Sequence, residues 1–378
     1  MSKPDKRYRV GISGSYGGLN LGDEAILTVI TRELRRCLPV HITVFSRNAA
    51  DTLQRHAVDQ ALTIRDLTRA EARSEIEQLD LLVLGGGGIL YDSEAAVYLR
   101  EVLLAHELGV PVMVYAISAG PLRAGSVRRI VKEALDQAAL LTVRDRQGAR
   151  LLEDIGVREP IQVTADPALL LEPEPLPDDT LVRESLDLSH RIVGFSVREP
   201  GPAAPEIDVD HYHHLLANAA DFMVDRLDAD IVFVPMERQH MDIQHSHAVV
   251  AKMQCAQRAS VLKGEYTPGQ LLQLVGQFQF AVGMRLHFLI FAALRGVPFV
   301  SLPYAAKVSG LLQALDMDMP PLGNVNSGRL LANIDHSWDL RADLATKIRA
   351  RLPQLQARAR KTNNLLVELL NRPSIGKH

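Results

Sequence analysis

Short apolar runs alternate with amphipathic helical segments along most of the chain. The runs are nearly continuous in apolar residues, which is typical of strands that are buried on both faces of a parallel sheet. The pattern predicts strands at 8–14, 40–46, 80–84, 111–120, 139–145, 191–199, 229–237, 279–283 and 298–303. It also predicts helices at 22–38 and 94–109, the second of them with Gly109 as its C-cap. Strands that alternate with helices indicate the α/β class, with helices covering parallel sheets.

A proline-rich and acidic segment, 171–179, interrupts this alternation near the middle of the chain. Such a composition is typical of a linker, and the alternation of strands and helices restarts after it. We therefore predict an N-terminal α/β domain at 1–175, a C-terminal α/β domain at 186–339 and a charged helical tail at 340–378. The cleft between two such domains is the expected ligand site.

Composition narrows the class of protein. The chain has 378 residues, of which 47% are hydrophobic and 23% charged, as in a soluble globular protein with sizeable cores. A net charge of −3 without an extended basic block does not favour nucleic-acid binding. Cys37 and Cys255 lie far apart and form no CxxC pair, which argues against a disulfide framework or a cysteine zinc site. No signal-peptide core or membrane-length apolar window is found, so we expect a cytoplasmic protein.

The segment 283–315 carries the strongest chemical signal. Arg285 and His287 directly follow the strand at 279–283, and Lys307 follows the next strand after a short loop. The carboxyl ends of strands are where open α/β sheets bind ligands, and converging cations favour an anion, phosphate above all. The alternative is that both cations solvate loop ends and that His287 is an ordinary histidine with satisfied hydrogen bonds.

Two more arginines follow predicted strands. Arg144 ends the strand at 139–145 and either reaches the cleft or pairs with Asp145. Arg198 ends the first strand of the C-terminal domain and is a further candidate for the cleft. Asp166 precedes the linker, where we expect a structural cap or hinge anchor rather than a catalyst.

Two glycine-rich segments follow strands of the N-terminal domain. The loop at 14–22 matches neither GxGxxG nor the P-loop pattern, so it indicates no dinucleotide or nucleoside triphosphate. Asp23 and Glu24 follow this loop, and their negative charges would oppose a phosphate at the start of the helix. They either hold sugar hydroxyls or act as a base. The alternative is a structural role, with Asp23 as the helix N-cap and Glu24 as a first-turn acid. The second loop, Gly85 to Gly88, requires a bare backbone, either for a ligand or for tight packing of the sheet on a helix; we favour the ligand.

The histidines cluster at 211–214 and 240–247. Because they lack the HExxH spacing and fall in polar segments, we expect solvated histidines and no metal site. A catalytic serine elbow is also missing, since Ser118 in AISAG lacks the first glycine of GxSxG.

Taken in order, these motifs resemble the polysaccharide pyruvyl transferase family, over roughly 9–314. The resemblance rests on a series of segments: Tyr16-Gly17-Gly18, Asn20, Gly22-Asp23-Glu24, Leu84 to Gly88, Ser118-Ala119-Gly120-Pro121, Val143-Arg144-Asp145, Ala165-Asp166-Pro167-Ala168, Met284-Arg285-Leu286-His287 and Lys307. It implies two Rossmann-like domains in a GT-B-like arrangement with an interdomain cleft. It also implies transfer of pyruvate from phosphoenolpyruvate to a sugar as a cyclic ketal. We expect no cofactor besides this donor substrate.

The resemblance also assigns roles to residues. It places the donor-binding and catalytic positions at Arg144, Arg285, His287 and Lys307. It places Asn20, Asp23 and the glycine loops, with Gly17, Gly86 and Gly87, on the acceptor side. An imidazole suits the acid that protonates phosphoenolpyruvate, which makes His287 the candidate acid and Arg285 the partner of the phosphate or carboxylate.

Several points stay open at this level. The chain has YAAK where some relatives carry an acidic residue before the lysine, and it has an unusual run of four glycines, so the acceptor sugar and linkage are not fixed. A lipid-linked acceptor with peripheral membrane contact, and the oligomeric state, are equally open. One alternative function is a GT-B nucleotide-sugar glycosyltransferase, although no acidic ribose-binding pair follows Lys307. Another is a glycan-binding subunit, against which stands the low aromatic content of 5%, with Trp338 the lone tryptophan.

Overall fold

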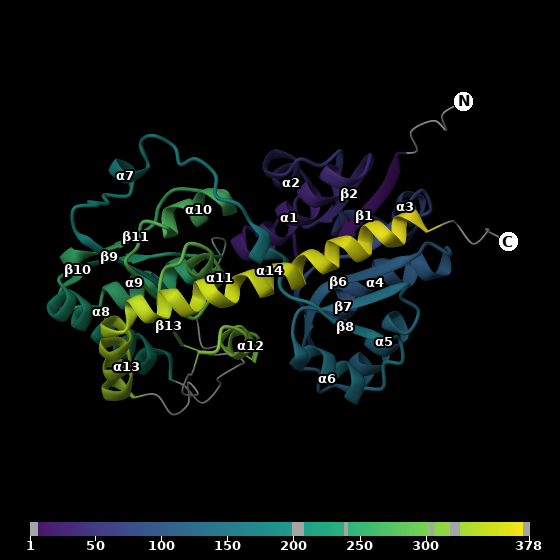
Figure 1. The fold of residues 1–378 in the computed structure, drawn as a ribbon. Coiled ribbons are helices and arrows are strands. Elements are labelled where there is room, and N and C mark those ends of the chain that lie inside the picture. Colours follow the sequence, from purple (N-terminus) through teal and green to yellow (C-terminus); the bar gives the residue numbers. More distant parts are fainter. Residues whose placement is uncertain (1–6, 199–207, 238–240, 303–305, 318–325, 373–378) are drawn as a thin grey trace. The chain divides into compact units, whose positions relative to one another are not determined.

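The computed structural model describes residues 7–198, 208–237, 241–302, 306–317 and 326–372, with only the backbone described at 306 and 307. The chain forms two compact units (Figure 1). Unit 1 consists of Met1–Gly18, Asp23–Leu171 and Gln356–His378, and unit 2 consists of Leu19–Gly22 and Glu172–Leu355. The chain therefore changes unit at the short segment Leu19–Gly22, again inside the proline-rich segment, and once more between Leu355 and Gln356.

Unit 1 is built on an eight-stranded sheet in the order β3-β2-β1-β4-β6-β7-β8, with β5 paired to β6. All of these pairs are parallel. The strands are β1 (Tyr8–Ser13), β2 (Val40–Ser46), β3 (Gln60–Thr63), β4 (Leu81–Leu84), β5 (Gly87–Leu90), β6 (Val112–Ala119), β7 (Leu140–Val143) and β8 (Ile161–Val163). The central strands are apolar on both faces, which requires covering helices on both sides.

Most of the helices of unit 1 have buried residues on one face, although η1 (Ile64–Asp66) has none. They are α1 (Leu21–Cys37), α2 (Ala49–Arg55), η1 (Ile64–Asp66), α3 (Arg69–Ile76), α4 (Ala95–Glu107), α5 (Gly125–Leu135), α6 (Arg146–Asp154) and η2 (Pro167–Leu170). Local signals set several of their ends. Thr68 and Glu71 form a capping box at the start of α3, and Gly109 takes a φ of 67° just after α4.

Unit 2 repeats the same design on a five-stranded parallel sheet in the order β11-β10-β9-β12-β13. Its strands are β9 (Arg191–Ser196), β10 (Ala229–Phe233), β11 (Ala259–Val261), β12 (Phe280–Gly283) and β13 (Phe299–Ser301). Its helices are α7 (Thr180–Arg183), α8 (Val209–Leu227), α9 (Asp242–Val250), η4 (Ala256–Arg258), α10 (Pro268–Val275), α11 (Leu286–Leu294), α12 (Ala306–Ala314) and α13 (Ser327–Asp339). Both units are Rossmann-like domains.

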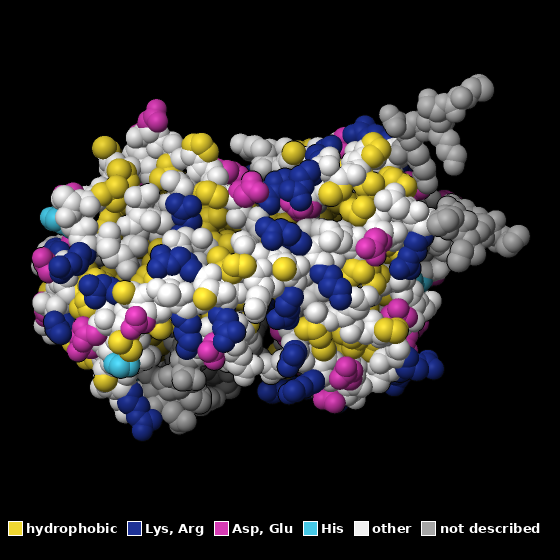
Figure 2. All heavy atoms as spheres, in the orientation of Figure 1, with side chains coloured by type: hydrophobic (Ala, Val, Ile, Leu, Met, Phe, Trp, Pro, Cys, Tyr) yellow, Lys and Arg dark blue, Asp and Glu magenta, His cyan; other side chains and the backbone are white. Residues whose placement is uncertain are grey.

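The C-terminal helix α14 (Arg341–Asn371) is amphipathic along its whole length. Most of its buried residues are three, four or seven positions apart: Ala345, Ile348, Leu355, Ala359, Thr362, Asn363, Leu366 and Leu370. This is the spacing of one helix face. The face of the molecule in Figure 2 carries Lys and Arg side chains interspersed with Asp and Glu, rather than a block of one sign. No helix within the described ranges is long and apolar enough to cross a membrane.

The sequence predicted the class and most elements correctly. The α/β class with parallel sheets and the glycine after α4 are confirmed. The main correction concerns the second glycine loop, because Gly87 and Gly88 lie in strand β5 and pair with Ile117 and Ser118. The strands β3, β8 and β11 were not predicted, since segments of three or four residues carry too little pattern.

Candidate functional site

Each sheet has a topological switch point, where successive connections leave in opposite directions. In unit 2 the switch lies between β9 and β12, because the chain runs outward from β9 to β10 and β11, and from β12 to β13. The two strands are paired with Gly283 opposite Ser196. Ligands of open α/β sheets bind outside the carboxyl ends of strands at such a point.

The predicted donor residues of unit 2 gather at this switch point. Arg198 follows β9 and is half-buried, and Arg285 and His287 directly follow β12. Arg285 is the N-cap of α11, and its side chain makes no capping hydrogen bond. A guanidinium cannot accept from the first-turn N–H groups as Ser, Thr, Asp or Asn would. The start of α11 therefore offers its positive dipole end beside two cationic side chains.

Lys307 lies in α12, after the neighbouring strand β13. Its side chain falls outside the described residues, so its predicted donor role stays a prediction.

A buried carboxylate holds Arg285. The Nε of Arg285 donates to Oδ2 of Asp242 at 2.9 Å, and its Nη2 donates to Oδ1. The same Oδ2 accepts from the backbone N–H groups of Met236 and Glu237 at 3.1 and 3.0 Å. Asp242 has no exposed surface. Since a guanidinium has five N–H donors, it can bind this carboxylate and an anionic ligand at once. Asp242 itself was missed in the sequence, where the surrounding histidines drew attention.

The segment Leu19–Gly22 contributes the other wall of this site and belongs to unit 2, although its last two residues begin helix α1. The N–H of Leu21 donates to the carbonyl of Met236 at 2.8 Å, and Asn20 forms an antiparallel bridge with Glu237. The side chain of Asn20 accepts from the N–H of Gly22 at 3.1 Å. Asn20 is thus part of unit 2 with His287, whereas Asp23 belongs to unit 1.

The histidines at 211–214 and 240–247 differ from the expectation of solvated side chains. His213 of α8 and His245 of α9 are both buried, and Nε2 of His213 lies 2.7 Å from Nδ1 of His245. Burial, followed by the charge of His245, lowers the pKa of His213. His211, His214 and His247 are exposed as expected. The prediction failed for the first pair because the apolar faces of α8 and α9 pack on each other, which periodicity in a polar segment does not show.

In unit 1 the switch point lies between β1 and β4, and a side chain of the protein fills it. The ring of Tyr16 lies against the ends of both strands and has no exposed surface. A Cβ at Gly14 would lie 2.6 Å from Cε2 of this ring, and one at Gly85 would lie 2.8 Å from its Cζ. Gly14 and Gly85 are therefore explained by the packing of Tyr16. Burial, with the nearby charges of Asp23 and Glu24, raises the pKa of Tyr16 far above its usual value.

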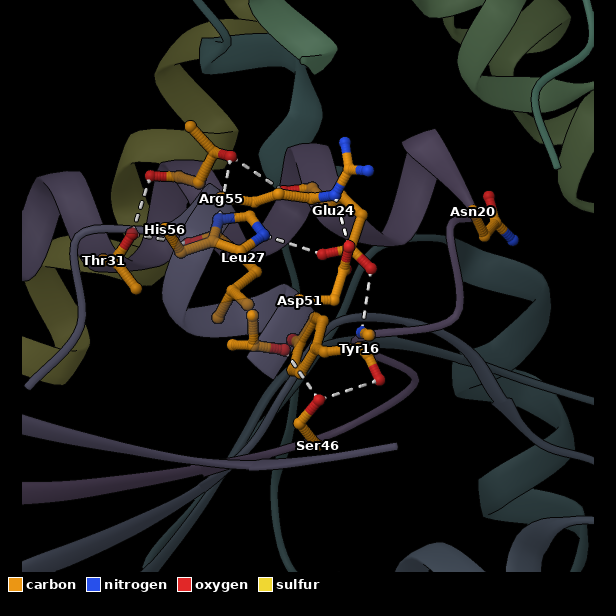
Figure 3. A network of polar contacts seen from close by, with 12 residues as sticks. Tyr16, Asn20, Glu24, Leu27, Thr31, Ser46, Asp51, Arg55 and His56 are labelled. Atoms are coloured by element: carbon orange, nitrogen blue, oxygen red, sulfur yellow. Dashed lines mark hydrogen bonds and ion pairs between the residues drawn. The ribbon is translucent and has the colours of Figure 1, made fainter. Parts of the chain in front are cut away.

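The backbone of Gly17, in the first glycine loop, also contacts groups of the protein itself. Its N–H donates to Oε1 of Glu24 at 2.9 Å, and Oε2 of Glu24 lies 2.7 Å from Nε2 of His56 (Figure 3). Glu24 and His56 are both buried. Gly17 takes a φ of 71°, and a Cβ there would lie 2.7 Å from the backbone nitrogen of Asn48. Glu24 is therefore an internal anchor of the loop, rather than a sugar ligand or a simple first-turn acid.

The second glycine segment packs on helix α1. A Cβ at Gly86 would lie 3.1 Å from the side chain of Ile26 and 3.2 Å from the carbonyl oxygen of Tyr115. Gly87 has a φ of 107°, and its Cβ would lie 3.1 Å from Oδ1 of Asp23. Asp23 lies within α1 and is not its N-cap. Tight packing thus accounts for Gly86, while ligand binding by Gly17, Gly86 and Gly87 stays a prediction.

A polar cluster near Asp23 was missed in the sequence. Nη2 of Arg47 donates to the hydroxyl of Tyr98 and lies 3.9 Å from Oε2 of Glu94. Burial alone would lower the pKa of Arg47, but Tyr98, Glu94 and Asp23 outweigh it and raise that pKa. Burial and the charge of Glu94 raise the pKa of Tyr91 to about 12. These residues lack a motif spacing, so only the fold reveals that they lie together.

Arg144 is engaged inside unit 1. Its Nη1 donates to Oδ2 of Asp166 at 2.7 Å, and its Nε lies 3.9 Å from Asp145. The side chain of Arg144 is only 3% exposed. Asp166 also caps η2 by accepting from the N–H of Ala168, which confirms its predicted structural role. The donor role of Arg144 stays a prediction.

Across the described part of the chain, no group of three or more His, Cys, Asp or Glu side chains is arranged to hold a metal ion. The predicted absence of a metal from the reaction stays a prediction.

Comparison with solved structures defines the fold. A putative UDP-N-acetylglucosamine 2-epimerase from Listeria monocytogenes superposes with a TM-score of 0.66 at 12% identity, covering 96% of this chain and 95% of its own. A glycosyltransferase from Rickettsia africae gives 0.65 at 11% identity, covering 97% and 100%. Anabaena Alr3699/HepE, solved with UDP and glucose, gives 0.65 at 15% identity, covering 96% and 99%. At these identities the likeness shows the fold alone, and it confirms the predicted GT-B-like fold.

Comparison of sequences is more specific. The sequence model of the family described as polysaccharide pyruvyl transferase matches residues 20–305, which is most of the chain. No curated protein matches the sequence.

Proposed function

Because the chain belongs to the polysaccharide pyruvyl transferase family, we propose that it takes pyruvate from phosphoenolpyruvate. The receiving group is a sugar of a polysaccharide or of its lipid-linked precursor, and the products are a pyruvate ketal and phosphate. The family makes the chain a transferase enzyme that acts on a glycan. The donor, and the form of the acceptor, are proposed from the site.

One observation carries the choice of donor: Arg285, His287 and the N-terminus of α11 lie together at the switch point of unit 2. Phosphoenolpyruvate carries a phosphate and a carboxylate on one small carbon skeleton. A helix N-terminus binds one such group through backbone N–H donors, and an arginine binds the other bidentately. Asp242 fixes Arg285 through two hydrogen bonds, so the arginine is positioned before the donor arrives.

The proposed reaction needs one acid and balances its protons. An acid protonates the methylene carbon of phosphoenolpyruvate, which becomes the methyl group, and C2 becomes electrophilic. A sugar hydroxyl adds to C2, and its proton returns to the acid. The C2–O bond to phosphate then breaks, a second hydroxyl of the same sugar adds to C2, and phosphate carries that proton away.

His287 is the proposed acid. It stands in the first turn of α11, directly after Leu286, which is buried and anchors the turn. Its side chain is half-buried, so the protein fixes the imidazole without removing it from the reaction site. Arg198 and Lys307 are proposed as further donor contacts, because they follow the neighbouring strands β9 and β13.

The acceptor side is proposed for unit 1. Asp23 lies beside Gly87, and Arg47 with Glu94 and Tyr91 forms the polar cluster nearby. Carboxylates and a guanidinium are suited to sugar hydroxyls, which both donate and accept hydrogen bonds. A lipid-linked acceptor would bring the enzyme to the cytoplasmic face of a membrane, and binding to vesicles that carry the acceptor tests this.

The fixed cations suit an anionic donor, so we propose that the chemical step needs no metal and no further cofactor. Activity that is lost on chelation and restored by one divalent ion would contradict this.

The experiment that tests the function measures phosphate release from phosphoenolpyruvate in the presence of candidate glycans. We expect release only when donor and acceptor are both present, with a ketal on the sugar. In calorimetry, Arg285→Ala should weaken donor binding by roughly tenfold or more, since a hydrogen bond to a charged group contributes about 1.5–3 kcal/mol.

The outcomes separate the alternatives. Unchanged donor affinity in Arg285→Ala would reject this donor site. Sugar transfer from a UDP-sugar, without phosphate release from phosphoenolpyruvate, would indicate a nucleotide-sugar glycosyltransferase. Glycan binding with neither reaction would indicate a binding subunit.

A further inference from the structure

Gly22 lies directly against the imidazole of His287, within unit 2. A Cβ built on Gly22 would lie within 2.7 Å of the ring atoms Nδ1, Cγ and Cε1 of His287. Real Cβ atoms essentially never approach heavy atoms so closely, so the imidazole occupies the space of the missing side chain. The backbone of Gly22 is the surface on which the Nδ1 edge of the ring rests.

The conformation of Gly22 does not explain why a glycine stands there. Gly22 is not among the glycines with positive φ, such as Gly17 and Gly87, and it is the second residue of α1, where glycine is a poor helix former. Space, rather than backbone geometry, is therefore the reason for glycine at this position.

Neither partner in this contact can easily move. Three interactions hold the turn at Leu19–Gly22. The N–H of Leu21 donates to the carbonyl of Met236, and Asn20 forms a β-bridge with Glu237. The N–H of Gly22 donates to the side chain of Asn20. On the other side, His287 is held in the first turn of α11 after the paired strand β12.

The two sides share one anchor. Asp242 accepts from the backbone of Met236 and Glu237, on which the turn rests, and also from Arg285, two residues before the imidazole. The wall behind His287 and the proposed donor-binding arginine are thus fixed by the same carboxylate.

We propose that Gly22 is a positioning residue of the reaction: its bare Cα fixes the imidazole of His287 in the orientation that delivers the proton. Asn20 and Leu21 hold this wall in place, which gives Asn20 a role beside the acid rather than on the acceptor. The proposal rests on the function proposed for His287.

The test compares Gly22→Ala with Gly125→Ala, the same substitution at a glycine of α5 whose Cβ would meet nothing within 4 Å. A misplaced catalytic group costs about 10²-fold in rate. We therefore expect Gly22→Ala to lower turnover by about 10²-fold, to change KM for phosphoenolpyruvate much less, and to shift the pH–rate profile. Gly125→Ala should leave all three unchanged.

A double-mutant cycle shows whether Gly22 acts through His287. In a His287→Gln background, Gly22→Ala should lower turnover by no more than about threefold. Equal losses in both backgrounds, or wild-type activity of Gly22→Ala, would overturn the proposal while leaving the function of His287 intact. Loss of the proposed function itself would appear differently, as an enzyme whose wild type releases no phosphate from phosphoenolpyruvate.

A stability cycle covers the case in which Gly22→Ala folds poorly. His287→Ala removes the ring that the new methyl group meets, so it should restore the thermal midpoint of Gly22→Ala toward that of His287→Ala alone. If His287→Ala and Gly22→Ala destabilise additively, the contact does not fix the imidazole and the proposal is wrong.

Discussion

The two switch points of this protein look alike in topology and differ in what fills them. In unit 1, glycine-rich segments follow β1 and β4, but the ring of Tyr16 occupies the space between them and Glu24 takes the N–H of Gly17. In unit 2, the sequence that follows β9 and β12 is not glycine-rich. Instead, Arg198, Arg285, His287 and the start of α11 meet there.

The difference shows what a glycine-rich loop means. Bare backbone lets another group come close, and that group can be a ligand or a side chain of the same protein. Around Gly14 and Gly85 it is a tyrosine, and at Gly22 it is a histidine. A convergence of cations at strand ends is more informative, because isolated charges rarely gather without an anion to bind.

The largest expected effect concerns the imidazole of unit 2. His287→Gln should lower turnover by about 10²- to 10⁴-fold, which is the usual contribution of a general acid. Donor affinity should fall much less, because Arg285 and the start of α11 remain. Steady-state rates of phosphate release and calorimetric titration with phosphoenolpyruvate measure the two quantities.

Near-normal turnover of His287→Gln across the pH range would contradict a catalytic role for the imidazole at the switch point of unit 2. If turnover and donor affinity fell together, His287 would be a binding residue, and the proton would come from elsewhere.

The next effect concerns the anchor of the cationic site. Asp242→Asn leaves Arg285, which is 12% exposed, without its buried counter-charge. Removing one partner of a buried pair costs roughly 3–5 kcal/mol, so we expect a loss of that order in the free energy of unfolding, together with weaker donor binding. Denaturant unfolding measures the loss.

Asp228→Asn is the matched control, because Asp228 pairs with Arg258 at the surface and is 83% exposed. A surface pair contributes about 0–1 kcal/mol, and its loss should not affect the donor. Similar losses in both variants would mean that Asp242 is no special anchor.

A smaller effect, of opposite sign, is expected at the filled switch point. The hydroxyl of Tyr16 is fully buried and, within the described residues, has no hydrogen-bond partner. Tyr16→Phe keeps the ring and removes this group, whose burial without a partner costs about 1–3 kcal/mol. We expect a thermal midpoint that is unchanged or raised.

The same variant sharpens the comparison by its kinetics. An unchanged KM for the acceptor would agree with a purely structural tyrosine. A lower thermal midpoint, or a large rise in that KM, would show that the hydroxyl of Tyr16 binds a ligand and that the switch point of unit 1 is functional.

The smallest expected effect is a dependence of folding stability on pH that arises from His213 in unit 2. The pKa of His213 is lowered by burial and by the charges of His245 and Lys252, against the opposing charge of Asp210. The unfolded chain takes up this proton near the usual pKa of 6.5, whereas the folded chain resists it. Stability should therefore fall as the pH drops below about 6.5.

Thermal unfolding between pH 7.5 and 5.5 measures this slope. His213→Gln should flatten it, and the same change at the exposed His211, on the same helix, should not. An identical slope in all three proteins would locate the pH dependence elsewhere.

The sequence predicted the fold well and the site in part. Long apolar runs such as β1, β6 and β9 carry the period of a buried strand, and α1 and α14 carry that of an amphipathic helix, so their type is encoded locally. Arg285 and His287 could be placed at the end of a strand, because such an end can be recognised without knowing its neighbours, and their roles stay predictions. The resemblance to the pyruvyl transferases is likewise confirmed by the match over 20–305.

The remaining features depend on contacts between distant segments. In the sequence, Asp242 is an acidic residue in a histidine-rich segment. Only the fold shows that it binds Arg285, 43 residues further along the chain. Gly22 reads as part of a loop that enters a helix, and nothing local indicates an imidazole from residue 287. The buried pair of His213 and His245 is hidden for the same reason, because two polar segments give no sign that they pack on each other.

The turn at Leu19–Gly22 also bears on how such enzymes can be diversified. Unit 2 is not one continuous stretch of chain, because four of its residues, Leu19–Gly22, are encoded far upstream, where the chain enters helix α1. A gene fragment for 172–355 would carry the imidazole without the backbone on which it rests. Recombination that exchanges whole domains between relatives, in nature or in the laboratory, would therefore have to bring the matching upstream turn with it.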